Sequence, residues 1–243
     1  MLEIVYKHRV IKVEHWDQLS QHEFIELWRR INASWFNAEG RVELTKWLYS
    51  NQCSDKFIIK KLKYNRLKLC GPENGFRNMT AGEFLFADTY YFTYLRDNNA
   101  EILDKFIATI FRKKAGIFTK VIYRILKRRK FADNRIEFDE NLINARAKLI
   151  ENIVFKIKQA ILFNYGAVRK DMTKKFKYLF PIPPDPEKNK KTKTKIVIPN
   201  WEIWMWQLAS GNTDADFNKV ASTLALNFFR RIDMLIKESK PKK

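Results

Sequence analysis

The chain has 243 residues, of which 46% are hydrophobic and 14% aromatic, and its formal net charge at pH 7 is +20. These values exclude a disordered basic tail, because a chain this rich in apolar side chains can bury a folded core. We expect no secretory signal and no membrane span, since no apolar run is long enough for either. Cys53 and Cys70 give no disulfide framework, so we expect a reducing compartment and buried thiols.

The first third of the chain combines a strand-like start with short helices. Residues 3–14 alternate apolar and polar side chains and are rich in β-branched residues, a pattern that predicts one or two short strands. Ser20 and Glu23 form a capping box, which predicts the beginning of the first helix. Two further short helices and then a turn are expected over 41–49, 55–64 and 71–75.

The central block, residues 80–180, is expected to hold most of the helical core. Thr80 and Glu83 form a second capping box before a helix with aromatic residues on all sides, so most of its surface must be covered. The next helix repeats apolar residues at i, i+3, i+4, i+7 and i+8 from Leu103 onward. The same spacing resumes after Gly116, which predicts a further helix there.

The second half of the central block predicts long helical structure. Residues 139–179 contain no proline and a single glycine, so we expect one helix or two collinear helices broken near Gly166. Earlier in the block, Asp88 interrupts the aromatic helix. We expect Asp88 to be a buried, structural carboxylate paired with Arg96 or Arg112, a role that we favour over a catalytic one.

A segment rich in proline and lysine precedes the C-terminal helices. Its prolines cannot lie inside a helix, and its sequence KNKKTKTK has five lysines and no apolar side chain, so residues 181–199 are expected to form an extended, mobile linker. Apolar stripes over 201–208 and 217–235 predict two helices joined by a turn at 211–212.

The predicted fold class is mainly α, a helical bundle with a small N-terminal β element. Four regions are expected in chain order. They are an N-terminal region of strands and short helices, a central helical domain, the linker, and a C-terminal helical hairpin, with bounds 1–78, 79–180, 181–199 and 200–243.

The most one-sided charge lies between Lys105 and Phe131, where ten Lys or Arg occur without one Asp or Glu. Cations at helix ends offset the helix dipole, which explains part of this charge, but ordinary helix surfaces mix both signs. We therefore expect this segment and the linker lysines to bind a phosphate backbone or an acidic protein surface. The expected binding residues are Arg112, Lys113, Lys114, Lys120, Arg124, Lys127, Arg128, Arg129, Lys130, Lys188, Lys190, Lys191, Lys193 and Lys195.

Other chemistry is sparse in the sequence. The three histidines, His8, His15 and His22, lie near the strand-like start and lack the spacing of a metal site or the partners of a catalytic triad. There is no glycine-rich phosphate loop. We expect no catalytic site, no metal and no cofactor. The tryptophans Trp201, Trp204 and Trp206 predict a core or a protein interface rather than a stacking platform for bases.

Three stretches resemble proteins of one kind: NMTAGEFLFADTYYFTYLRDNNAEILDKFIATIFRK, IKQAILFNYGAVRKDMTKKFKYLFP and WEIWMWQLASGNTDADFNKVASTLALNFFRRI. Their pattern of core positions is similar to that of helical proteins encoded in the virion-assembly modules, especially tail modules, of phages and prophages. The resemblance covers about two thirds of the chain, from Asn78 onward, and transfers no functional residues.

The resemblance implies a non-enzymatic role in virion or tail assembly, as a chaperone or adaptor. The implied partners are other virion or tail proteins and further copies of the chain, in the virion or in the cytoplasm of an infected bacterium, with a possible DNA contact. The alternative hypothesis is a basic nucleic-acid-binding protein that grips phosphate backbones. An enzyme acting on nucleic acid is disfavoured, because the sequence shows no set of metal-binding carboxylates.

Overall fold

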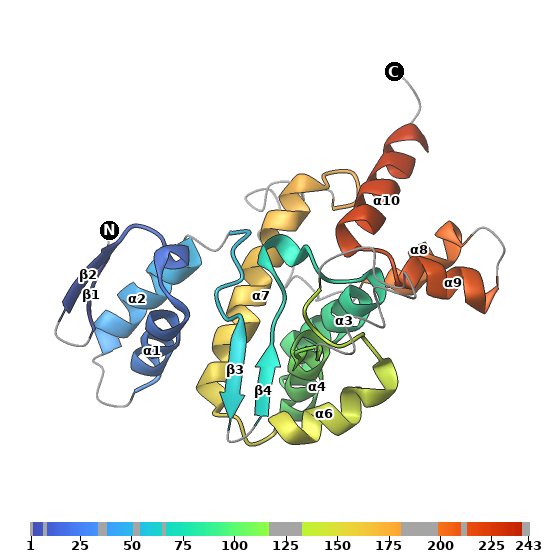
Figure 1. Ribbon diagram of the computed structural model, residues 1–243. Helices are drawn as coiled ribbons and strands as arrows, with labels where there is room; N and C mark the ends of the chain where they lie inside the picture. The colour runs from blue at the N-terminus through green and yellow to red at the C-terminus, as the bar shows by residue number, and fades with distance from the viewer. Residues whose placement is uncertain are drawn as a thin grey trace.

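The computed structural model describes residues 2–6, 9–33, 38–50, 54–64, 67–116, 133–180, 199–209 and 213–239. In these ranges the protein is mainly α-helical with small β elements, which confirms the predicted fold class (Figure 1). The helix expected after Gly116, the linker over 181–198 and the turn at 211–212 lie outside the described residues.

The N-terminal part begins with an antiparallel hairpin. Strands β1 (Leu2–Tyr6) and β2 (Arg9–Val13) pair along their length, as the alternating pattern predicted. After the short 3-10 helix η1 (Trp16–Gln18), helix α1 (Gln21–Ile31) begins at Ser20 with the expected capping box. Helix α2 (Ala38–Ser50) covers the segment in which a short helix was predicted.

The helix predicted over 55–64 is wrong, because this stretch forms the first strand of a second sheet. Strand β3 (Lys61–Tyr64) pairs with β4 (Leu67–Cys70), and β4 pairs with β5 (Arg112–Lys113), all antiparallel. The extended backbone before β3 is held by the Asn164 side chain, whose oxygen accepts the Ile58 and Ile59 amides at 2.7 and 3.2 Å. These distant partners satisfy backbone groups that a helix would otherwise pair internally.

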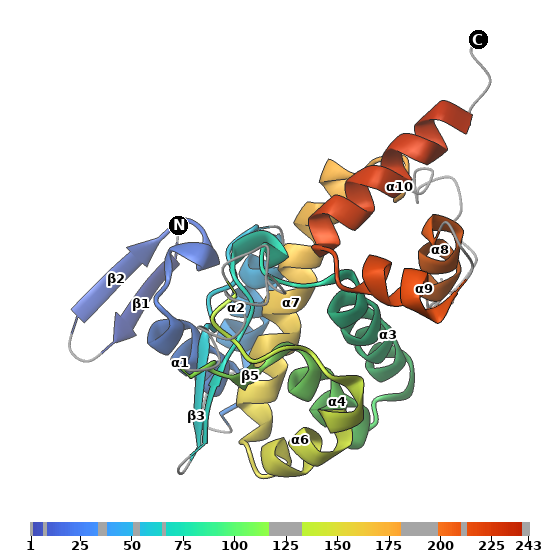
Figure 2. The same cartoon turned by 45° about the vertical axis from the view of Figure 1, so that its right-hand side comes forward.

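Four α-helices form the central part of the described chain, and the last of them is the longest. They are α3 (Ala81–Asp97), α4 (Ala100–Ile110), α6 (Ile143–Ile150) and α7 (Phe155–Lys175), with the 3-10 helices η2 (Asn74–Phe76) and η3 (Glu140–Leu142) before α3 and α6. Helix α7 lies between the N-terminal helices and the pair α3 and α4 in both views (Figure 1, Figure 2). All parts contribute to one continuous hydrophobic core.

Residues 139–179 hold two α-helices, as one of the two expected alternatives has it, but the break is not near Gly166. Helix α7 runs through it, and the break lies instead between Ile150 and Phe155. A methyl group at Gly166 would lie 2.5 Å from the hydroxyl oxygen of Tyr91 on α3. The glycine therefore permits close packing of α7 against α3 rather than a change of direction.

The C-terminal part consists of α8 (Trp201–Leu208), α9 (Asp214–Ala221) and α10 (Ala225–Ser239). The single helix predicted over 217–235 is thus two helices. The break arises because the chain pairs there with the segment before α3: Ala81 N–H donates to the Thr223 carbonyl at 2.8 Å, and Ala225 N–H to the Met79 carbonyl at 2.9 Å. Helix α10 then extends away from the body (Figure 2).

Asp88 is a buried, paired carboxylate, as predicted, but its partners differ from those expected. It accepts hydrogen bonds from Arg169 on α7 and from the Trp201 indole on α8, the latter at 2.8 Å. Arg169 also stacks over the Phe92 ring, 4.4 Å from its centre. Asp88 thereby ties α3, α7 and α8 together. Arg96 pairs with Asp97 instead.

Candidate functional site: an acidic cleft beside a buried ion network

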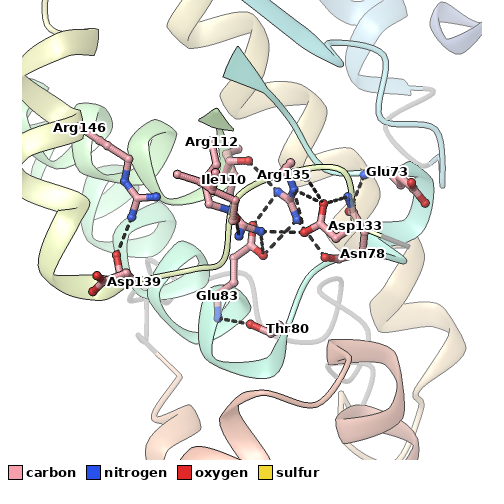
Figure 3. Close-up of polar contacts among 11 residues, drawn as sticks. Glu73, Asn78, Thr80, Glu83, Ile110, Arg112, Asp133, Arg135, Asp139 and Arg146 are labelled. Carbon is pink, nitrogen blue, oxygen red and sulfur yellow. Dashed lines mark hydrogen bonds and ion pairs between the residues drawn. The ribbon is translucent and has the colours of Figure 1, made fainter. Parts of the chain in front are cut away.

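Four buried charges form a network of ion pairs beneath the start of α3 (Figure 3). The Glu83 carboxylate accepts hydrogen bonds from Arg112 and Arg135, each at 2.7 Å. Asp133 accepts from the same two arginines, each at 3.1 Å. With two positive and two negative side chains, the network carries no net charge. We refer to these four residues as the ion network.

Strand pairing places both arginines on one face of the sheet. Lys114 is bridged to Arg135 in antiparallel register, and Ile136 N–H donates to the Lys113 carbonyl at 2.9 Å. Because side chains alternate along a strand, Arg112 and Arg135 project from the same face toward α3. The short segment around Arg135 thus pairs with β5 at the edge of the sheet.

Glu83 joins this network from the first turn of α3. Its backbone N–H donates to the Thr80 hydroxyl at 3.1 Å, so Thr80 caps the helix as expected. Its carboxylate, however, pairs with the two arginines rather than with the Thr80 amide. The predicted capping box is therefore only half formed, and the acidic side chain also meets the positive end of the helix dipole.

The two arginines differ in their electrostatic surroundings. Burial lowers the pKa of Arg112 to about 10, with Glu83 opposing this effect and Arg135 adding to it. Burial alone would also lower the pKa of Arg135, but the attraction of Glu83 and Asp133 raises it above its ordinary value. Arg135 donates in addition to the Asn78 and Ile110 carbonyls, whereas the Nε of Arg112 has no hydrogen-bond partner among the described residues. Both guanidinium groups remain charged at pH 7.

A cleft of about 1000 Å³ opens beside the ion network, with Arg112 and Asp133 in its lining. Its walls come from the first turns of α3, the segment 137–140, helix α8, and the junction of α9 with α10. The other lining residues are Thr80, Gly82, Leu85, Phe86, Glu137, Phe138, Asp139, Glu140, Glu202, Met205, Phe217, Asn218, Lys219, Ala221, Ser222, Thr223, Leu224 and Asn227.

The rim of this cleft is acidic although the chain as a whole is strongly basic. Glu137, Glu140 and Glu202 are exposed, Asp139 is half-buried, and Lys219 is the one lining cation besides Arg112 among the described residues. Arg146 fixes part of the rim, since it donates to the Asp139 carbonyl at 2.6 Å and to the Leu142 carbonyl at 3.2 Å. We call this feature the acidic cleft.

The predicted binding residues fall into three groups: one is buried, two are exposed, and the others lie outside the described ranges. Arg112 is 1% exposed and belongs to the ion network, so it is not part of a basic surface. This prediction is wrong because α4 ends at Ile110 and the chain turns into β5, which points Arg112 inward. Lys113 and Lys114 are exposed. The remaining residues lie outside the described ranges: Lys120, Arg124, Lys127, Arg128, Arg129, Lys130, Lys188, Lys190, Lys191, Lys193 and Lys195.

The three tryptophans occupy different positions on α8. Trp201 is buried in the core and donates to Asp88. Trp206 is half-buried and lies against the Phe217 ring of α9, with 4.6 Å between the ring centres. Trp204 is also half-buried. Trp201 and Trp206 therefore join α8 to the body and to α9, and the predicted protein interface of the three tryptophans stays a prediction.

Within the described ranges, no group of three or more His, Cys, Asp or Glu residues is placed to hold a metal ion. His15 pairs with Asp17 at 2.9 Å, and Cys70 is a half-buried free thiol. No helix of the described part is both long and apolar enough to cross a membrane. Comparison of the chain with protein-family models, curated proteins and solved structures finds no match.

Proposed function

We propose that this protein is a non-enzymatic assembly protein that binds a segment of a partner in the acidic cleft. The observation that supports this function is the charge of the cleft rim, which is opposite to the +20 of the chain. Charge complementarity of this kind selects a partner and guides its approach. The resemblance to tail and virion assembly proteins suggests another virion protein or a second copy of the chain as the partner.

The composition of the cleft suits a peptide segment that is both apolar and basic. Leu85, Phe86 and Phe138 give it half-buried apolar walls, while Glu137, Glu140 and Glu202 offer carboxylates to cations. Apolar contacts of this type supply affinity, and the charged rim supplies specificity. Self-association through such a contact joins two different surfaces, so it generates rings or chains of subunits.

The pairing of the buried acids favours a structural role over a catalytic one. The acids of the ion network are neutralised by arginines, and Asp88 is neutralised by Arg169. Buried ion pairs of this kind position helices and strands rather than transfer protons. The rim carboxylates Glu137, Glu140 and Glu202 are exposed, and no group of three or more His, Cys, Asp or Glu in the described ranges is placed to hold a metal ion.

The test is co-expression of the chain with the products of its neighbouring genes, followed by size-exclusion chromatography with light scattering. The cleft variant carries Glu137→Gln, Glu140→Gln and Glu202→Gln. The control carries the same charge change at exposed sites elsewhere, Glu43→Gln, Glu151→Gln and Glu238→Gln.

We expect a stable complex with one gene product, or an oligomer of the chain, that the cleft variant loses and the control keeps. A complex that survives in the cleft variant would show that the acidic cleft is not the binding site. Absence of both a complex and an oligomer would contradict the assembly function itself.

A further inference from the structure

The register of the second sheet lines up lysines on one of its faces. Lys63 lies directly opposite Lys68 in the β3–β4 pair. The β4–β5 pair matches Leu69 with Lys113, and continuing this register by one step places Lys114 beside Lys68. Side chains opposite one another share a face, so Lys63, Lys68 and Lys114 form a row across three strands at steps of about 4.8 Å. We call these three residues the lysine row.

The lysine row faces solvent and has no carboxylate partner. All three side chains are exposed, and none forms an ion pair with an acid in the described part of the chain. Lys61 is also exposed on the same face, two residues from Lys63. The opposite face carries the buried Leu62 and Leu69, which explains why the lysines project outward.

Two lysines on helices, by contrast, are paired with acids on the same helix. Lys105 pairs with Glu101 at 2.7 Å and Lys175 with Asp171 at 2.5 Å, each one helical turn away. Like charges directly opposite each other on a sheet repel and weaken the pairing. The row therefore carries a stability cost that an external anion would relieve.

We propose that the lysine row binds the phosphate backbone of a nucleic acid without reading its base sequence. A line of closely spaced ammonium groups matches a polymer with a regular line of charge, and duplex DNA carries one negative charge per ~1.7 Å of its axis. Lysine acts on phosphate as a point charge and gives no base-specific geometry. Tyr64, the aromatic residue of β3, lies on the other face, so this face has no platform for stacked bases.

This inference goes beyond the proposed function, because none of the three lysines of the row lines the acidic cleft. An acidic protein is the competing partner for the row. The regular spacing favours the nucleic acid, since carboxylates on folded protein surfaces are usually interspersed with cations and neutral groups.

The test measures binding of a fluorescein-labelled 30-base-pair DNA duplex to the nuclease-treated full chain over a series of salt concentrations. The row variant carries Lys63→Gln, Lys68→Gln and Lys114→Gln. The control carries Lys148→Gln, Lys174→Gln and Lys237→Gln, exposed residues on three helices. A third variant replaces the row with arginine, which keeps the charge. Thermal unfolding of each variant shows that the fold is retained.

Each phosphate contact contributes about 0.9 to the slope of log affinity against log salt. We expect the row variant to lower this slope by roughly two to three units, the control to change it by less than one, and the arginine variant to keep it. An equal decrease of the slope in the row variant and in the control would show that the lysine row is not the binding site. Absence of DNA binding at low salt would show that nucleic acid is not the ligand. Polyglutamate that binds as tightly as DNA, with the same dependence on the row, would assign the surface to an acidic protein instead.

Discussion

The ion network and the lysine row are two ends of one line of cations, and they differ in how the charge is balanced. The register Lys63, Lys68, Lys114 continues to Arg135, which is bridged to Lys114. At Arg135 the sheet is covered by α3, and Glu83 and Asp133 neutralise the charge internally. At the lysines the sheet faces solvent without a neutralising acid among the described residues. The buried end requires an internal counter-charge for folding, whereas the open end can keep its charge for a partner.

The largest expected effect comes from Glu83→Gln, which leaves the two buried arginines with one carboxylate of the ion network, Asp133, instead of two. Breaking a buried ion pair on one side costs about 3 to 5 kcal/mol, so we expect the free energy of unfolding to fall by about that amount. Urea denaturation measures it. Glu101→Gln, which breaks an exposed pair, serves as the control and should change little. A small loss for Glu83→Gln would mean that the network contributes no more than a surface pair.

The free energy of unfolding should fall at alkaline pH, because the pKa values of two tyrosines, Tyr91 and Tyr165, are raised in the folded protein. Burial raises the pKa of Tyr91 from 10.0 to about 12, and burial raises that of Tyr165 well above its usual value. A folded pKa above the unfolded one gives stability that is complete below pH 10 and is lost as pH rises through 12. For Tyr91 this amounts to about 2 to 3 kcal/mol.

Tyr91→Phe should therefore flatten the fall in stability between pH 10 and 12, as measured by urea denaturation at several pH values. Tyr178→Phe is the matched control, because Tyr178 is 38% exposed and does not contribute to the pKa shift of Tyr91. An unchanged pH profile for Tyr91→Phe would show that the phenol does not titrate across folding.

The smallest expected effect concerns the stability of the free sheet. Lys63→Gln removes one of two opposed charges, so we expect a gain of a few tenths of a kcal/mol at low salt that disappears in high salt. Thermal unfolding in both conditions measures the difference. Lys148→Gln, on the surface of α6, should show no such salt-dependent gain. A loss of stability in Lys63→Gln would argue that the row is not under repulsion.

Local signals in the sequence predicted much of the helical structure. Ser20 and Thr80 cap α1 and α3 as expected, because capping depends on residues within one turn. The sheet was not predicted, since β4 pairs with β5 at positions more than 40 residues away. Its strands KLKY and LKLC are also too short to differ clearly from a helical pattern.

The ion network, the acidic cleft and the lysine row are formed by residues far apart in the sequence, so local patterns do not predict them. The sequence predicts a cation at a helix end for Arg112, because Lys113 and Lys114 follow it. Its actual partner, Glu83, lies 29 residues earlier in the chain. The acidic cleft draws its rim from segments as far apart as Glu137 and Glu202. The lysine row has a partial signal in the alternating lysines of β3, but only the register brings Lys114 beside Lys68.

Assembly through the acidic cleft can be tested by the molar mass of the nuclease-treated protein in light scattering, before and after the three substitutions in the cleft. We expect a mass of at least two chains, or of the chain with a co-expressed partner, that falls to one chain in the cleft variant and not in its charge-matched control. A mass of one chain at every concentration, with and without the neighbouring gene products, would contradict assembly through this cleft.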